Sequence, residues 1–173
     1  MKATLNRLKE PRGIALVAIT AALYVALTAP FGILGFEMVQ FRFSEILCLL
    51  AFIDPIYGVG ITIGCFFANL ASPFGLLDIA VGTFCTALSV ICISKSKNLF
   101  LATIWPTIFS IPVAGVITLM STAGVGFIAT AAWLALCEFI MVTVIGYPVF
   151  RTILKNPEIY MLLKFNENKA TLQ

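Results

Sequence analysis

Long uncharged runs dominate the pattern of apolar and polar positions along this chain. The first covers residues 13–36 and the longest covers residues 98–137. A helix of about 20 apolar residues can cross a bilayer, and a run twice that length must contain two helices joined by a turn. The pattern therefore predicts six helices, at residues 13–29, 42–53, 56–72, 76–94, 99–120 and 127–150.

The composition supports a membrane protein. Hydrophobic residues make up 61% of the chain, charged residues make up 11%, and the mean hydropathy is +1.06. A soluble domain has about a quarter of its residues charged. The sequence predicts an all-α integral membrane protein with six transmembrane helices in a single domain, residues 1–173, because 173 residues leave no room for a separate soluble catalytic domain.

The positive charges predict the orientation in the membrane. Six crossings place both termini on one side, and lysine and arginine favour the cytoplasmic side. Ten of the 11 basic residues then face the cytoplasm, and Arg42 is the exception. We expect a cytoplasmic segment at 1–12, a six-helix core at 13–150 and a cytoplasmic tail at 151–173. Membrane topology accounts for the basic residues, so no nucleic-acid partner is expected.

Four polar side chains are predicted to lie in the middle to outer part of the membrane. A helix rises 1.5 Å per residue, so counting from the cytoplasmic ends of their helices places Glu45, Asn69, Asp78 and Glu138 about 14 to 26 Å up. The hydrocarbon layer is roughly 30 Å thick. These residues are expected to line one cavity that opens outward.

Each of these residues also has a purely structural interpretation. Arg42 and Glu45 lie three residues apart on one helix face and can neutralise each other. Glu138 can instead neutralise Arg42, Asp78 can cap its helix, and Asn69 can bond a neighbouring helix. As a set, however, Glu37, Glu45, Asp78 and Glu138 face the single cation Arg42. This surplus of carboxylates favours a ligand that is cationic or rich in N–H donors.

Small residues form stripes on two predicted helices. Ala18, Ala22 and Ala26 recur every four residues on the first. Gly60, Gly64, Ala68 and Ser72 do the same on the third. Such stripes permit close helix packing, and the alanine stripe could equally dock a partner protein.

Several classes of protein are excluded. The five cysteines stand singly in apolar runs and the chain has no histidine, so no metal or cofactor site is expected. The phosphate-loop and nucleophile-elbow motifs are absent, which argues against an enzyme. A chain of this kind that transports a solute must couple transport to an ion gradient or act together with a separate ATPase.

Three segments resemble the queuosine-precursor transporter (QueT) family. They are VQFRFSE at 39–45, ANLASPFGLLD at 68–78, and Glu138 followed by GYP at 146–148. The resemblance implies a substrate-binding S component of an energy-coupling-factor (ECF) ABC importer in a prokaryotic plasma membrane. Such a component binds a micronutrient near the outer face and topples while docked on a transmembrane T component driven by two ATPase subunits. It docks through an alanine motif, which Ala18, Ala22 and Ala26 match.

The resemblance also implies a 7-deazaguanine substrate, either 7-aminomethyl-7-deazaguanine or queuine. A carboxylate can accept two parallel hydrogen bonds from the N–H groups of a guanine-like edge. Glu138 is the first candidate for this acceptor. Glu45 or Asp78 would face the ammonium of an aminomethyl substrate. Arg42 or Asn69 would donate a hydrogen bond to the ring carbonyl. Phe41 or Phe43 would stack on the base. The candidate substrate-binding residues are Glu138, Glu45, Arg42, Asn69, Asp78, Gln40, Phe41 and Phe43.

Two other functions stay open. An S component of the same architecture could bind another micronutrient such as cobalamin. A self-sufficient ion-coupled carrier could use Glu45 and Glu138 as a proton relay. A membrane-embedded enzyme is a weaker alternative, because no nucleophile is paired with a base.

Overall fold

The computed structural model describes residues 2–30, 42–120 and 124–165, and every regular element in these ranges is helical. The all-α prediction is confirmed for this part of the chain. The elements are α1 (Lys2–Arg7), α2 (Pro11–Thr28), the 3-10 helix η2 (Phe43–Leu49), α3 (Leu50–Ile53), α4 (Pro55–Asn69), α5 (Gly75–Ser94), α6 (Leu99–Met120), α7 (Phe127–Glu138), the π-helix η3 (Phe139–Gly146), α8 (Tyr147–Lys155) and α9 (Pro157–Leu163).

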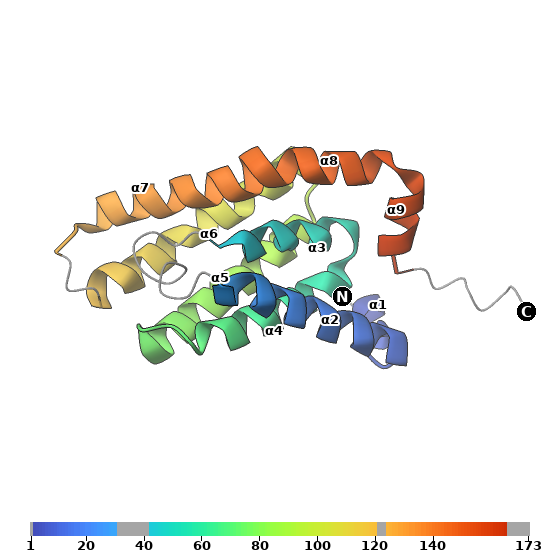
Figure 1. Cartoon of the computed structure of the whole chain (residues 1–173), viewed down its shortest axis with the longest axis horizontal. Helices are drawn as coiled ribbons and strands as arrows, with labels where there is room; N and C mark the ends of the chain where they lie inside the picture. The colour runs from blue at the N-terminus through green and yellow to red at the C-terminus, as the bar shows by residue number, and fades with distance from the viewer. Residues whose placement is uncertain (1, 31–41, 121–123, 166–173) are drawn as a thin grey trace, which may run out of the picture.

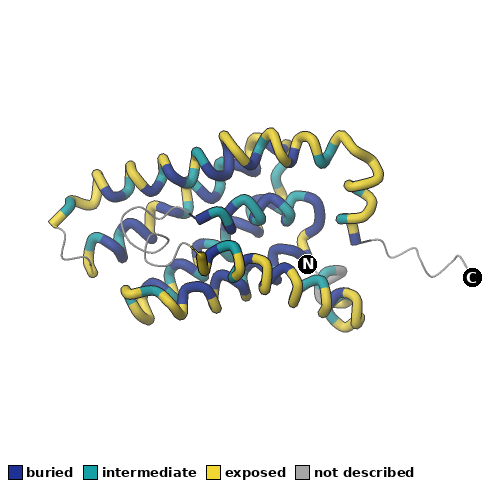
Figure 2. The backbone as a smooth tube through the Cα atoms, viewed as in Figure 1, coloured by how far each residue is buried: buried dark blue, intermediate teal, exposed yellow. Residues whose placement is uncertain are grey.

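The helices pack as a bundle around a buried central segment. Helix α2 packs on α4, α4 on α5, α5 on α6, and α6 on α7. The segment η2–α3 runs between these helices, and Figure 2 shows it largely buried while the outer faces of α2 and α7 are exposed. Helices α7, η3 and α8 continue one another along one edge of the bundle, and α9 turns away at their end (Figure 1).

Apolar side chains cover the outside of the bundle, as expected for a protein surrounded by lipid. Leu76, Leu119 and Ile128 are 84%, 83% and 83% exposed. Among the described residues, four helical stretches are long and apolar enough to cross a membrane: Pro11–Thr28, Gly75–Ser94, Leu99–Met120 and Phe127–Lys155. The apolar helices Phe43–Ile53 and Pro55–Asn69 are shorter. The count of six crossings and the cytoplasmic location of the termini stay predictions.

Glycines bring α2 and α4 into close contact. A Cβ added to Gly60 would lie 2.7 Å from the Val17 carbonyl oxygen, and one added to Gly64 would lie 2.7 Å from Tyr24 Cβ. No larger residue fits at either position without moving the helices apart. The predicted role of the stripe Gly60, Gly64, Ala68 and Ser72 in close helix packing is therefore confirmed at its two glycines.

Two stretches depart from regular α-helix. The prediction of plain helices at 42–53 and 127–150 was wrong for Phe43–Leu49, which is 3-10, and for Phe139–Gly146, which is π. The two irregular stretches pack against each other. A 3-10 helix is tighter and a π-helix wider than an α-helix, so both change where side chains point, and single π turns often occur at functional sites.

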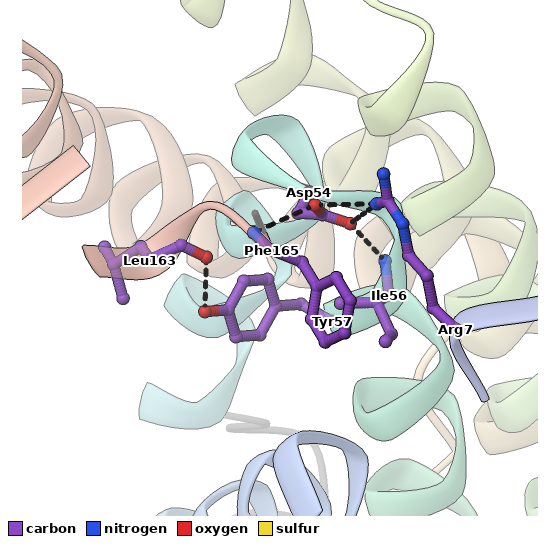
Figure 3. A network of polar contacts seen from close by, with 6 residues as sticks. All are labelled: Arg7, Asp54, Ile56, Tyr57, Leu163 and Phe165. Carbon is purple, nitrogen blue, oxygen red and sulfur yellow. Dashed lines mark hydrogen bonds and ion pairs between the residues drawn. The ribbon is translucent and has the colours of Figure 1, made fainter. Parts of the chain in front are cut away.

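Both described ends of the chain converge on Asp54, at the turn between α3 and α4 (Figure 3). The Asp54 side chain caps α4 by accepting a hydrogen bond from Ile56 N at 3.1 Å. It also pairs with Arg7 Nη1 at 3.0 Å and accepts a bond from Phe165 N at 3.2 Å. Helix α1 and the end of α9, neither predicted from the sequence, therefore lie at the same end of the bundle.

Candidate ligand-binding site

A cavity lies between η2, α5, α6 and α7. Its empty volume, including the space at its mouth, is about 410 Å³. The lining combines charged, hydroxyl and apolar side chains. It consists of Arg42, Glu45, Gly82, Cys85, Thr86, Ser89, Pro106, Phe109, Ser110, Val113 and Glu138.

Arg42 reaches the cavity from the start of η2 and is held there by Asn69. Its Nη1 donates to Asn69 Oδ1 at 3.1 Å, and both side chains are buried. Asn69 is fully buried at the end of α4, where its Nδ2 donates to Cys65 Sγ at 3.4 Å. Asn69 is not among the cavity-lining residues, so it lies behind Arg42 and fixes the position of the guanidinium.

Glu45 is a buried carboxylate with two described donors. The Tyr24 hydroxyl donates to Oε1 at 2.5 Å, and the Cys48 thiol donates to Oε2 at 3.2 Å. Burial of a carboxylate is costly unless hydrogen bonds compensate it. Tyr24 and Cys48 supply that compensation, so Glu45 is stable at the cavity wall without a ligand.

Glu138 contrasts with Glu45. It is the last residue of α7 and lines the same cavity, but its Oε2 is buried with no hydrogen-bond partner among the described residues. Few buried polar atoms in proteins are left without a partner. An unpartnered carboxylate oxygen beside a cavity marks the place where a ligand donor would be bound most favourably.

Asp78 lies outside the cavity lining and fastens the connection between α4 and α5. Its Oδ2 accepts a hydrogen bond from Ser72 Oγ at 2.6 Å, and Ser72 Oγ accepts one from Phe74 N at 3.2 Å. A Cβ on Gly82 would lie 2.7 Å from Asn69 Nδ2 and 3.9 Å from Asp78 Oδ1. Asn69 thus sits against the glycine that forms part of the cavity wall.

Among the described residues, Phe109 is the aromatic side chain that lines the cavity, and the sequence did not single it out. Trp105 stacks against it with ring centroids 6.1 Å apart. Phe43 instead packs against the main hydrophobic core and is not a lining residue. Gln40, Phe41 and Glu37 lie outside the described residues.

Sequence reasoning also missed the hydroxyl and thiol groups around the cavity: Tyr24, Cys48, Thr86, Ser89 and Ser110. A signal for part of this set was present. Gly82, Cys85, Thr86 and Ser89 follow helical spacing along one face of α5, and all four line the cavity. Small and weakly polar residues at this spacing indicate a face that does not contact lipid.

The alanine stripe on α2 does not pack inside the bundle. Ala18, Ala22 and Ala26 are all exposed, whereas the buried residues of α2 include Ala21 and Tyr24. Within the part of the chain that the structure describes, no group of three or more His, Cys, Asp or Glu side chains could hold a metal ion.

Comparison with known proteins gives a family match. The model of the family described as QueT transporter matches residues 14–155. A curated relative, the queuosine precursor transporter QueT of Lactococcus lactis subsp. cremoris (strain MG1363), is 42% identical over 72 residues. That alignment covers 40% of this chain and 42% of the relative. No solved structure matches.

Proposed function

Since this chain belongs to the QueT transporter family, we propose that it is the substrate-binding S component of an ECF-type ABC importer in a prokaryotic plasma membrane. It captures a queuosine precursor, 7-aminomethyl-7-deazaguanine or queuine, at the outer face. The observation that carries this proposal is that Glu138 Oε2, which has no hydrogen-bond partner among the described residues, belongs to a cavity that Glu45 also lines. The similarity to the queuosine precursor transporter of Lactococcus lactis supports the substrate class.

Glu138 recognises the guanine-like edge of the base in this proposal. A carboxylate can accept two parallel hydrogen bonds, one from the ring N–H and one from the exocyclic amine. Each charge-assisted bond contributes about 1.5 to 3 kcal/mol. A substrate edge of this kind would satisfy the Glu138 oxygen that is unpartnered among the described residues.

Glu45 is the proposed partner of the substrate ammonium, because it lines the cavity whereas Asp78 does not. Arg42 is the proposed donor to the ring carbonyl, held in position by Asn69. Asn69 and Asp78 then act on the ligand through the shape of the cavity. An aminomethyl compound or queuine carries a positive charge at neutral pH. Two cavity carboxylates therefore favour such a compound over the uncharged precursor that carries a cyano group in place of the aminomethyl group.

The exposed alanine stripe supports the proposed assembly with a T component and two ATPase subunits. Ala18, Ala22 and Ala26 leave α2 with a smooth outer strip. A partner helix can approach such a strip closely. ATP hydrolysis belongs to the partner subunits in this proposal, and this chain is not an enzyme.

Mass spectrometry of small molecules released from the purified, denatured protein tests the substrate. We expect the mass of a 7-deazaguanine base with a cationic side chain. Release of cobalamin or of a neutral ligand poor in N–H donors would contradict the proposal. Competition between unlabelled queuine and cobalamin provides the same discrimination in a binding assay.

A second function is favoured by one observation, since two carboxylates, Glu45 and Glu138, line the same membrane cavity. Such a pair can relay protons in an ion-coupled carrier. Liposomes that contain only this protein distinguish the two functions. Uptake that depends on a pH gradient would support the carrier, and uptake only after addition of the ATPase partners would support the S component.

A further inference from the structure

Many serine and threonine hydroxyls in these helices donate to a backbone carbonyl of the preceding turn. Thr62 donates to Gly58 O, Ser110 to Thr107 O and Thr118 to Ala114 O, each at 2.8 Å. Such back-bonding is the usual solution for a hydroxyl in an apolar helix, where water is not available. Ser89 departs from it, because its Oγ is buried with no hydrogen-bond partner among the described residues.

Ser89 also faces the candidate ligand-binding site. It is 3% exposed and lines the cavity, whereas Thr83 and Thr107, whose hydroxyls are unpartnered too, do not line it. Glu138 reaches the same cavity from α7, and both α5 and α7 pack against α6. Ser89 Oγ and Glu138 Oε2, each without a partner in the part of the chain that the structure describes, therefore face the cavity from different helices. One ligand with polar groups on two edges could satisfy both.

An apolar surface on α6 completes the cavity wall. It is formed by Pro106, Phe109 and Val113, which lie three to four residues apart along one helix face. Trp105 supports the Phe109 ring with an interplanar angle of 28°. A ring held in this way offers a surface on which a flat heteroaromatic ligand can stack.

We propose that Ser89 and Phe109 are specificity-determining residues for the substrate, an inference that rests on the proposed function. The Ser89 hydroxyl donates to the ring carbonyl of the base, while Glu138 accepts from its N–H groups. A carbonyl oxygen has two lone pairs, so Ser89 and Arg42 can bond to it together. Phe109 stacks on the face of the ring.

The test measures affinity for 7-aminomethyl-7-deazaguanine and for its thiocarbonyl analogue, in which sulfur, a weaker hydrogen-bond acceptor, replaces the ring carbonyl oxygen while the ring N–H that Glu138 binds is kept. Ser89→Ala is expected to weaken binding of the parent compound about fivefold, the effect of one net hydrogen bond. Thr83→Val removes an unpartnered hydroxyl of the same helix that does not line the cavity, and it should leave affinity unchanged. The thiocarbonyl analogue should lose much less affinity than the parent compound when Ser89 is replaced by alanine.

Phe109→Leu is expected to weaken both compounds by about threefold to tenfold, because stacking does not depend on the carbonyl. The thermal unfolding temperature of each variant shows whether weaker binding reflects a lost ligand contact or a destabilised fold. If Ser89→Ala and wild type bind the parent compound with equal affinity, the inference about Ser89 is wrong, while the proposed function stands. The same conclusion follows if Ser89→Ala loses as much affinity for the analogue as for the parent compound. A wild type that binds neither compound would overturn the proposed function and this inference together.

Discussion

Two carboxylates in one cavity have different surroundings, and the roles proposed for them follow from this difference. Glu45 accepts from Tyr24 and Cys48, whereas Glu138 Oε2 has no partner among the described residues. A charged group in the membrane interior costs several kcal/mol unless it is paired. Glu45 is compensated by the protein itself. We therefore propose that Glu138 is the carboxylate whose free energy a bound ligand would change most.

At the residue scale, Gly82 is predicted to be essential for the shape of the site. In Gly82→Ala the new Cβ would lie 2.7 Å from Asn69 Nδ2. The amide must move, and its hydrogen bond to Arg42 is then lost or lengthened. We expect at least a fivefold loss of substrate affinity in equilibrium binding. Gly115→Ala is the matched control in α6, because its Cβ meets nothing closer than 3.8 Å, and equal effects of the two variants would refute this role of Gly82.

The sequence predicted the charged residues that line the cavity better than it predicted the hydroxyl and thiol groups around them. An intramembrane carboxylate or guanidinium requires compensation, so Arg42, Glu45 and Glu138 were recognisable from their apolar surroundings alone. Ser89 was not, because a serine hydroxyl in an apolar helix usually bonds its own backbone. Only the three-dimensional arrangement shows that Ser89 does not.

At the element scale, the Asp54 cluster is predicted to stabilise the end of the bundle. Asp54→Ala removes the cap of α4, the ion pair with Arg7 and the bond from Phe165 N. We expect a loss of about 2 kcal/mol in the free energy of unfolding, measured by denaturant titration in detergent. Asp54→Asn retains an acceptor for the cap and should lose about half as much. Equal losses would show that the ion pair dominates.

The regular helices were predictable, whereas the irregular ones were not. The run 99–120 was predicted with the observed bounds of α6, and α5 begins one residue before its prediction. The 3-10 helix η2 and the π-helix η3 were missed because, over seven or eight residues, apolar periodicity is too coarse to separate their tighter or wider turns from the 3.6 residues per turn of an α-helix. Helices α1 and α9 are short and carry little periodic signal.

At the scale of the whole molecule, the exposed face of α2 is predicted to be the surface that docks the T component. Ala22→Leu places a larger side chain in the alanine stripe and should reduce co-purification with the T component at least tenfold. Substrate affinity should stay unchanged, because Ala22 does not line the cavity. Ala132→Leu is the control, since Ala132 is an exposed alanine of α7. Full co-purification of Ala22→Leu would exclude this face as the docking surface.

The most direct test of the central claim is titration calorimetry of the purified protein with 7-aminomethyl-7-deazaguanine. Glu138→Gln keeps the size of the side chain but replaces an acceptor oxygen with a donor. The proposal predicts at least tenfold weaker binding, equivalent to about 1.4 kcal/mol, and weaker binding of the uncharged cyano precursor to the wild type. Unchanged affinity of Glu138→Gln for the aminomethyl compound would contradict the account.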